Sequence, residues 1–152
     1  MRSILAAASD LVREGSPLSL SAVARRAGVA RITVYNRFGS RAALLGAVTP
    51  AADPTPAETL ERHFEAVCNR WAADPALFRN LPLGEPENAA RAIAESLAAG
   101  DRLRPGVSIR EAEDVIAALS SFAVFDRLHR DGRRPASAVA DVLMRLAAGI
   151  IA

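Results

Sequence analysis

Apolar residues recur at intervals of three and four along almost the whole chain, and this spacing limits the fold more than any other feature. Such spacing gathers apolar side chains on one face of an α-helix. No segment alternates apolar and polar residues as a half-buried β-strand does. Because 51% of the 152 residues are hydrophobic, the helices can also bury a sizeable core. The sequence therefore predicts an all-α protein.

Glycine, serine and alanine residues predict where the N-terminal helices begin and end. A first helix stops at Gly15. Ser19 can cap a second helix, and Ser40 can cap a fourth over residues 41–48. Ala30 stands where a side-chain cap would help the third helix, so we expect that helix start to be weaker by about 1 kcal/mol.

Three prolines close together, Pro50, Pro54 and Pro56, mark the expected domain boundary because proline interrupts a helix. We expect one domain over residues 1–49 and a second over residues 50–152. The second domain is expected to hold helices at about 57–73, 76–80, 87–99 and 108–130, and a last helix from about 136 to the C-terminus.

Residues 18–46 have the pattern of a helix-turn-helix motif. Ala24 lies on the inner face of the second helix, and Ala27-Gly28-Val29 form a tight turn after it. Beyond the turn, Val34 and Phe38 are four residues apart and anchor the third helix to the core. In this motif one helix braces the next, so that the outer side chains of the second can enter the DNA major groove.

The outer side of the third helix carries side chains that suit DNA. Arg31 matches guanine O6 and N7, Ile32 can touch a thymine methyl, and Asn36 borders them. Any one of these residues alone is as well explained by solvation or packing, but their spacing beyond the turn favours a DNA contact. The remaining DNA-contact candidates are hydroxyl and cationic donors: Ser19, Thr33, Tyr35, Arg37 and Arg41.

The charge of the chain is uneven. Residues 1–49 hold seven Arg against Asp10 and Glu14, a net charge of +5. Residues 50–152 hold twelve Arg against fifteen acidic residues, a net charge of −3. A basic N-terminal part on a mildly acidic body favours a localised anionic partner such as DNA.

Residues 4–48 resemble the DNA-binding head of the TetR family of bacterial transcriptional regulators. The resemblance is specific because a turn, a Thr-Val-Tyr triplet and a Phe-x-Ser-Arg cap all fall in register. The matching residues are Ile4, Ala7, Ala8 and Leu11 in the first helix, then Val23-Ala24, Ala27-Gly28-Val29, Thr33-Val34-Tyr35, Phe38, Ser40-Arg41 and Leu44-Leu45.

The resemblance implies an N-terminal three-helix helix-turn-helix head followed by a helical ligand-binding and dimerisation body. It implies a homodimeric repressor whose heads read a palindromic operator and whose body binds a small molecule that changes their spacing. It also implies two sets of contacts, in which Thr33, Tyr35, Arg37 and Arg41 take phosphates and Arg31, Ile32 and Asn36 face bases.

The last two expected helices are apolar on more than one side. Residues 136–151 are apolar on nearly every side, which is typical of a helix buried on more than one face. We expect a second copy to cover the helices at about 108–130 and 136–151, giving a four-helix bundle about a twofold axis. A central core helix in a monomer is the alternative. The residues expected to be buried on one side of the first of these helices are Ile109, Ala112, Ile116, Leu119, Phe122 and Phe125.

Aromatic residues outside the head recur at helical spacing and predict either a small-molecule cavity or an ordinary aromatic core. A mostly apolar cavity with a few polar groups is the usual build of a ligand site, and its ligand would be small and apolar or amphipathic. His63, beside this stripe, is expected to be exposed. The candidate ligand-binding residues are Phe64, Cys68, Trp71, Phe78, Phe122, Phe125 and His129.

The sequence also limits the compartment and the chemistry. Cys68 is the only cysteine, so no intrachain disulfide forms, and no metal-ligand motif or cofactor motif is present. No apolar run approaches the roughly 20 residues of a membrane span, and Asp10, Arg13 and Glu14 interrupt the N-terminal apolar stretch. We therefore expect a cytoplasmic protein that is not bound to a membrane.

The chain has no Gly-rich phosphate loop, His-rich metal motif or nucleophilic Ser elbow, so we do not expect an enzyme. The leading prediction is a ligand-responsive DNA-binding transcriptional regulator. The alternative is a small-molecule-binding helical protein with little or no sequence-specific DNA binding. Ala30 and Ile32 motivate this alternative, because the TetR family usually has Ser and a small residue at these positions.

Overall fold

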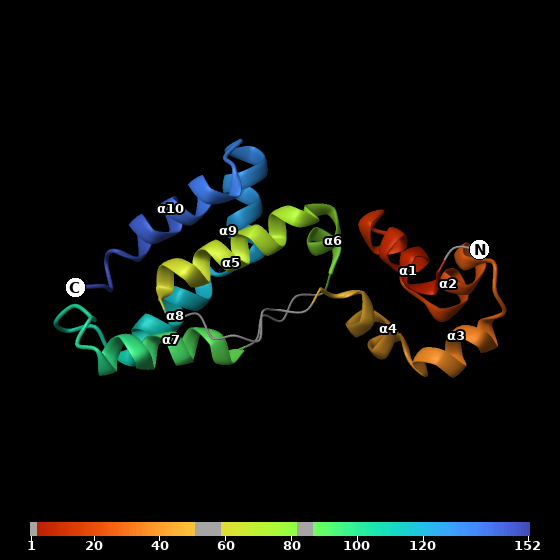
Figure 1. Ribbon diagram of the computed structural model, residues 1–152, viewed down its shortest axis with the longest axis horizontal. Coiled ribbons are helices and arrows are strands. Elements are labelled where there is room, and N and C mark those ends of the chain that lie inside the picture. The colour runs from red at the N-terminus through yellow and green to blue at the C-terminus, as the bar shows by residue number, and fades with distance from the viewer. Residues whose placement is uncertain (1–2, 51–58, 82–86) are drawn as a thin grey trace. The chain divides into compact units, whose positions relative to one another are not determined.

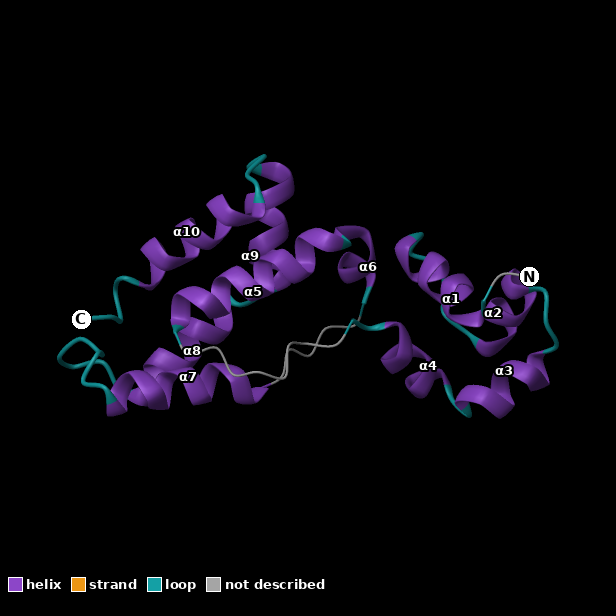
Figure 2. Ribbon diagram, viewed as in Figure 1, coloured by secondary structure: helices purple, strands orange, loops and turns teal. Residues whose placement is uncertain are grey.

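The computed structural model describes residues 3–50, 59–81 and 87–152, and their regular structure is helical (Figures 1 and 2). These residues form ten α-helices and one π-helix, with a single isolated β-bridge between Leu103 and Ile151. The prediction of an all-α protein is confirmed. Within the described residues, no helix is both long and apolar enough to cross a membrane.

The chain forms two compact units. The first contains α1 (Ile4–Arg13), α2 (Leu20–Ala27), α3 (Arg31–Phe38) and α4 (Arg41–Val48), together with α6 (Pro75–Asn80) from Ala76 onward. α6 therefore groups with the N-terminal helices although it follows α5 in the sequence. The domain boundary at residue 50 stays a prediction.

Small buried residues let the helices of the first unit approach closely. α2 packs against α1 and α3, and α4 packs against α1. Ala side chains have little volume, so two helix backbones can come near each other where Ala lies between them. The residues of α1 to α4 in this core that are exposed by 4% or less are Ala7, Ala8, Val12, Val23, Ala24, Ala27, Val34 and Leu44.

Serine caps fix the starts of three of these helices. Ser3, Ser19 and Ser40 each accept a hydrogen bond from the backbone N–H three residues later, at 3.0–3.1 Å. Ala30 precedes α3 without any side-chain cap, as the sequence predicts. The helix that carries the DNA-contact candidates therefore begins less firmly than its neighbours.

The second unit contains α5 (Leu60–Ala73), α7 (Glu87–Ala99), α8 (Ile109–Leu119), α9 (Phe122–Asp126), η1 (Arg127–Asp131) and α10 (Ala136–Ala147). α10 lies along α5, and α7 lies along α8 (Figure 1). Thr59 caps α5, so the described helix begins there, and residues 57–58 of the expected helix lie outside the described part. The largest fully buried side chains of this unit are Trp71, Phe64, Phe125, Leu60, Ile116 and Leu143.

The single helix expected over residues 108–130 is wrong. α8 ends at Leu119, Ser121 has extended backbone angles (φ −91°, ψ 134°), and the chain after α9 winds as the π-helix η1. Serine side chains bond to nearby polar groups and so compete with the helical backbone. Two consecutive serines, Ser120 and Ser121, are the local cause of the break.

Two further expectations for the last helices are wrong. α10 ends at Ala147 instead of continuing to the C-terminus. The last residues pair with the loop after α7, because the Arg104 N–H donates to the Ile150 carbonyl at 3.0 Å and the Ala152 N–H donates to the Arg102 carbonyl at 2.9 Å. Ile109, expected on the buried side, is 43% exposed because it stands at the first position of α8.

Candidate DNA-binding surface and aromatic core

α3 divides its side chains between the core and solvent. Val34 is completely buried and Phe38 is half-buried, which confirms them as inner residues. Ile32 and Tyr35 are 60% and 54% exposed and lie one turn apart on the helix. The other exposed side chains of α3 are Arg31, Thr33, Asn36 and Arg37. The six residues that the sequence assigns to DNA on this helix therefore share its solvent side.

A left-handed glycine makes the turn that sets α3 against α2. Gly28 has φ 72° and ψ 33°, and the Val29 N–H donates to the Ala24 carbonyl at 3.0 Å, which closes the end of α2. This conformation favours glycine because a Cβ atom would meet the backbone. Only Val29 and Ala30 separate Gly28 from the first residue of α3, so this short turn restricts the angle between the two helices.

Both acidic residues of the N-terminal part lie at α1. Asp10 pairs with Arg13 at 3.1 Å, and Glu14 forms two hydrogen bonds with Arg26 at 2.9 and 2.6 Å. The Glu14 carboxylate raises the pKa of Arg26 by this hydrogen bonding and by its charge. α2, α3 and α4 contain no acidic residue in their sequences. The positive charge of the unit is therefore concentrated on the side of α2 to α4.

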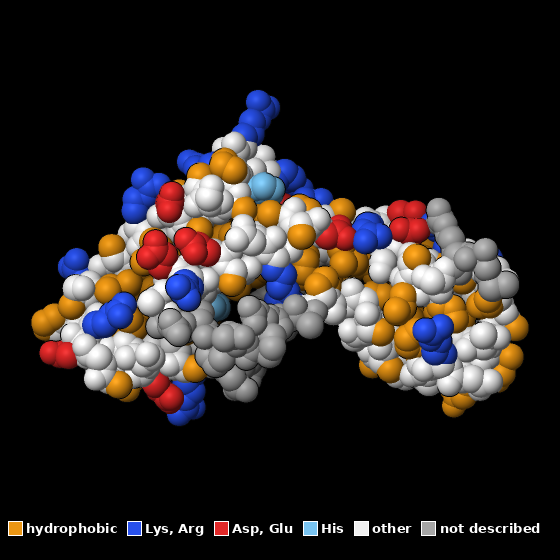
Figure 3. Space-filling view, in the orientation of Figure 1, with side chains coloured by type: hydrophobic (Ala, Val, Ile, Leu, Met, Phe, Trp, Pro, Cys, Tyr) orange, Lys and Arg blue, Asp and Glu red, His pale blue; other side chains and the backbone are white. Residues whose placement is uncertain are grey.

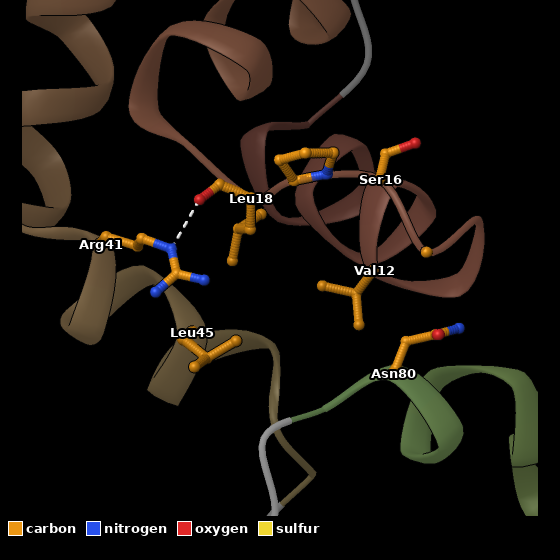
Figure 4. A pocket seen from close by; sticks show the side chains of 8 residues that line it. Val12, Ser16, Leu18, Arg41, Leu45 and Asn80 are labelled. Carbon is orange, nitrogen blue, oxygen red and sulfur yellow. Dashed lines mark hydrogen bonds between the residues drawn. The ribbon is translucent and has the colours of Figure 1, made fainter.

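Arg41 links α4 to the segment before α2. Its Nε–H donates a 2.7 Å hydrogen bond to the Leu18 carbonyl, at the edge of a small pocket of about 130 Å³ (Figure 4). Ser19, the next residue, uses its hydroxyl oxygen to accept the Ala22 N–H and remains exposed. The pocket is smaller than the roughly 300 Å³ at which small-molecule sites begin. Its lining consists of Val12, Gly15, Ser16, Pro17, Leu18, Arg41, Leu45 and Asn80.

Asn80 attaches α6 to the end of α1 within the first unit. Its amide nitrogen donates to the Arg13 carbonyl at 3.2 Å and to the Ala76 carbonyl at 3.1 Å. The last carbonyls of a helix have no partner within the helix, so the first bond satisfies one of them. The sequence gives no sign of this contact, because the two residues are 67 positions apart.

Four ligand-site candidates of the second unit form one cluster of rings: Trp71, Phe122, Phe125 and His129. The ring centroids of Trp71 lie 5.9 Å from Phe122 and 5.5 Å from Phe125, and Phe125 stacks on His129 at 4.8 Å. His129 Nδ1 lies 2.7 Å from the Arg134 carbonyl, and since a carbonyl can only accept, Nδ1 carries the proton. Trp71 comes from α5, Phe122 and Phe125 come from α9, and His129 comes from η1.

The remaining ligand candidates are placed differently. Phe64 and Cys68 are completely buried on the same side of α5 as Trp71. Burial raises the pKa of the Cys68 thiol to about 11, so this side chain stays neutral. Phe78 is also buried, but it lies in α6, in the part that belongs to the first unit.

His63 is half-buried, so the expectation that it is exposed is wrong. Its Nε2 lies 2.8 Å from the hydroxyl of Ser120, the C-cap residue that follows α8. Burial lowers the pKa of His63, which favours the neutral imidazole. Helical periodicity does not reveal this pair, although two serines inside an apolar helical pattern are a signal that a helix can end there. Among the described residues, no three His, Cys, Asp or Glu side chains are grouped as metal ligands.

A helix-turn-helix unit that exposes its second helix, followed by a helical body, defines the class of DNA-binding transcriptional regulators. Residues 4–48 match the family described as "Bacterial regulatory proteins, tetR family". The N-terminal part of the chain is thus similar to this family, in agreement with the resemblance seen in the sequence. No curated protein matches the chain.

Two solved structures share the fold over nearly the whole chain. One is NalD of Pseudomonas aeruginosa, described as the secondary repressor of the MexAB-OprM multidrug efflux pump. It has a TM-score of 0.73 and 22% identity, covering 97% of this chain and 93% of that one. The other is the transcriptional regulator FadR from Bacillus subtilis in complex with stearoyl-CoA, with a TM-score of 0.65, 20% identity and 97% coverage of both chains.

Proposed function

We propose that this protein is a repressor that binds a palindromic operator as a homodimer and is released by a small molecule bound in its body. One observation carries the DNA-binding part of the proposal. α3 buries only Val34 completely while it exposes six side chains, including the large apolar side chains of Ile32 and Tyr35. Neighbouring apolar side chains that are exposed among polar residues are typical of an interaction site.

The exposed face of α3 supplies both kinds of DNA contact. In this proposal Arg31 binds guanine O6 and N7, Ile32 packs on a thymine methyl, and Asn36 faces a neighbouring base. The Arg41 guanidinium is already fixed through Nε, so its Nη groups are presented to a phosphate in one orientation. The other phosphate ligands of the proposal are Ser19, Thr33, Tyr35 and Arg37.

Charge supports the same surface. The helices α2 to α4 carry arginines without acidic residues, whereas the second unit mixes both signs on the face seen in Figure 3. The electrostatic attraction between these arginines and the DNA phosphates contributes to affinity and weakens strongly as the salt concentration rises. Binding to chromosomal DNA would place the protein in the cytoplasm.

The proposed dimer uses an apolar strip on α10. Val139, Leu143 and Ala147 are buried in the unit's own core, whereas Leu146 is 57% exposed. Leu146 lies one turn after the half-buried Val142, at the edge of the buried side of α10. A second copy that packs its own α10 here would cover both strips about a twofold axis.

The helices that take part in the dimer differ from the sequence expectation in extent. α8 ends at Leu119 and α10 ends at Ala147, so the proposed bundle consists of these shorter helices instead of residues 108–130 and 136–151.

Sedimentation at micromolar concentration tests the proposed dimer. We expect a dimer for the wild type and a monomer for Leu146→Arg. Ser137→Arg, an exposed position on another side of α10, is the control and should remain dimeric. A monomeric wild type would refute the dimer.

Selection from a pool of genomic DNA fragments tests the DNA-binding function. We expect the protein to enrich one palindromic sequence, with an affinity that falls by roughly a thousandfold between about 50 and 200 mM salt if about six phosphates are bound. Failure to enrich any sequence at low salt would contradict the proposal. That outcome would favour the alternative of a small-molecule-binding protein without specific DNA binding, for which the uncapped start of α3 is the motivation.

A further inference from the structure

Trp71 is the only tryptophan of the chain and is completely buried near the end of α5. Among the residues that the structure describes, none accepts a hydrogen bond from its Nε1–H. A buried N–H without an acceptor costs free energy, because it has lost its hydrogen bond to water. Buried tryptophans therefore usually find an acceptor, and an exception calls for an explanation.

Two aromatic rings contact the Trp71 indole. The Phe122 ring stands at 83° to the indole with its centroid 5.9 Å away, and the Phe125 ring is tilted by 50° at 5.5 Å. Ring faces are weak acceptors compared with oxygen or nitrogen lone pairs. Flat faces at these distances are, however, suited to receive another aromatic ring in offset or edge contact.

The element that covers Trp71 is short and irregular. α9 has five residues, and Ser121 before it makes no side-chain cap bond. The π-helix η1 follows at once, and such turns often occur at functional sites. Phe122 and Phe125 of α9 contact the Trp71 ring of α5. Because Trp71 is completely buried, a ligand reaches the indole only if this short element moves.

The charge state of the residues near Trp71 limits which ligands can bind there. Cys68, on the same side of α5 as Trp71, is a neutral thiol, because burial raises its pKa to about 11. Asp126, the buried carboxylate of α9, already has Arg130 at 3.7 Å. Burying a further ion among aromatic rings would carry a large desolvation cost. An uncharged guest meets no such cost.

We propose that Trp71 determines the specificity of the ligand site in the body. The ligand is a flat, uncharged aromatic molecule whose ring lies against Phe122 and Phe125 and whose acceptor atom binds the Nε1–H of Trp71. This inference rests on the proposed function, since it names the ligand class of that regulator. A molecule with an acceptor gains a hydrogen bond and removes the penalty of the unsatisfied donor, whereas a molecule of the same shape without one leaves the penalty in place.

Two probes of the same shape test the inference. Isoquinoline carries a ring nitrogen that accepts a hydrogen bond, and naphthalene does not. Because the chain has one tryptophan, ¹⁵N-labelled protein gives a single indole N–H signal that reports on this donor alone. In mildly alkaline buffer we expect isoquinoline to move the indole proton downfield and to bind about tenfold more tightly than naphthalene.

Two variants separate the hydrogen bond from packing. In Trp71→Phe, the preference for isoquinoline should disappear, because the ring remains aromatic while the donor is gone. In Phe122→Leu, the preference should persist while the affinity for both probes falls, because packing is lost and the donor stays. Circular dichroism shows whether each variant is folded. The titration of the wild type tests the inference even if a variant does not fold.

The inference is overturned if both probes bind equally, if isoquinoline leaves the indole signal in place, or if neither probe binds up to its solubility. Operator selection with the same preparation keeps the two claims apart. Enrichment of an operator together with failure of isoquinoline refutes the ligand class alone. Isoquinoline binding at Trp71 without any enriched DNA sequence refutes the proposed function as a DNA-binding regulator instead.

Discussion

The Nε–H of Arg41 donates a 2.7 Å hydrogen bond to the carbonyl oxygen of Leu18, and this bond joins the first turn of α4 to the residue before the cap of α2. The bond occupies Nε and directs the Nη end of the guanidinium. One side chain thereby holds two helices of the head together and presents a cation next to α3. Substitution of Arg41 should therefore lower both the stability of the fold and the affinity for DNA, and the two effects can be measured separately.

Arg41→Met removes both the internal hydrogen bond and the charge. We expect the free energy of unfolding to fall by about 1 kcal/mol in urea denaturation. We also expect all DNA sequences to be bound more weakly to the same degree, with the salt dependence reduced by about one phosphate. Arg37→Met is the control: it should reduce the salt dependence in the same way and lower stability less, because it gives up only an exposed contact with the Phe38 ring. Loss of affinity for only one operator sequence in Arg41→Met would assign this residue to a base instead.

The division of α3 into an inner and an outer side predicts opposite effects at neighbouring positions. Val34→Ala should lower the free energy of unfolding by about 2 kcal/mol, because it removes buried methyl groups from a fully packed site. Ile32→Ala should change it by less than about 0.5 kcal/mol, because the side chain is 60% exposed. Ile32→Ala should instead weaken operator binding. Similar stability losses in both variants would show that the solvent side of α3 is packed in the folded protein.

His63 predicts a loss of stability in mild acid. Burial lowers the pKa of His63, so the folded chain resists a proton that the unfolded chain takes up near pH 6.5. Stability is therefore complete above that pH and falls as the pH decreases below it. Melting temperatures between about pH 7.5 and pH 5.5 should fall more steeply for the wild type than for His63→Gln, which has no titrating group but can still bond to Ser120. Parallel curves for the two proteins would show that His63 is protonated without cost.

Cys68 should be inert in the folded protein. Burial raises the pKa of its thiol to about 11, so only about one molecule in a thousand carries the reactive thiolate at pH 8. The side chain is also completely buried. A disulfide reagent should therefore react with the native protein at least about a hundredfold more slowly than with protein in concentrated guanidinium chloride. Equal rates would mean that α5 opens readily.

The head could be predicted from local sequence because its signals act over short distances. Ser19 and Ser40 cap helices that begin at the next residue, and Gly28 ends α2 through its own left-handed conformation. Val34 and Phe38 follow the helical period, so their inward side was also visible. Each of these features depends on neighbours within four residues, which the sequence displays directly.

The irregular parts of the body depend on contacts between distant residues, and the sequence does not display them. The bond from Asn80 to Arg13 spans 67 positions and assigns α6 to the first unit. The pair formed by His63 and Ser120 spans 57 positions, and it accompanies the break between α8 and α9. The pattern of apolar residues was continuous through this break, so periodicity alone predicted one long helix.

Arg31→Ala tests the central claim, that the exposed side of α3 reads an operator sequence. We expect the selected operator to be bound more weakly by roughly 1–3 kcal/mol, with base preference relaxed at one position of each half-site. Fluorescence anisotropy with single-position variants of the operator measures both effects. The account predicts that the lost preference is for guanine at that position, whereas unchanged affinity together with unchanged preference at every position would contradict it.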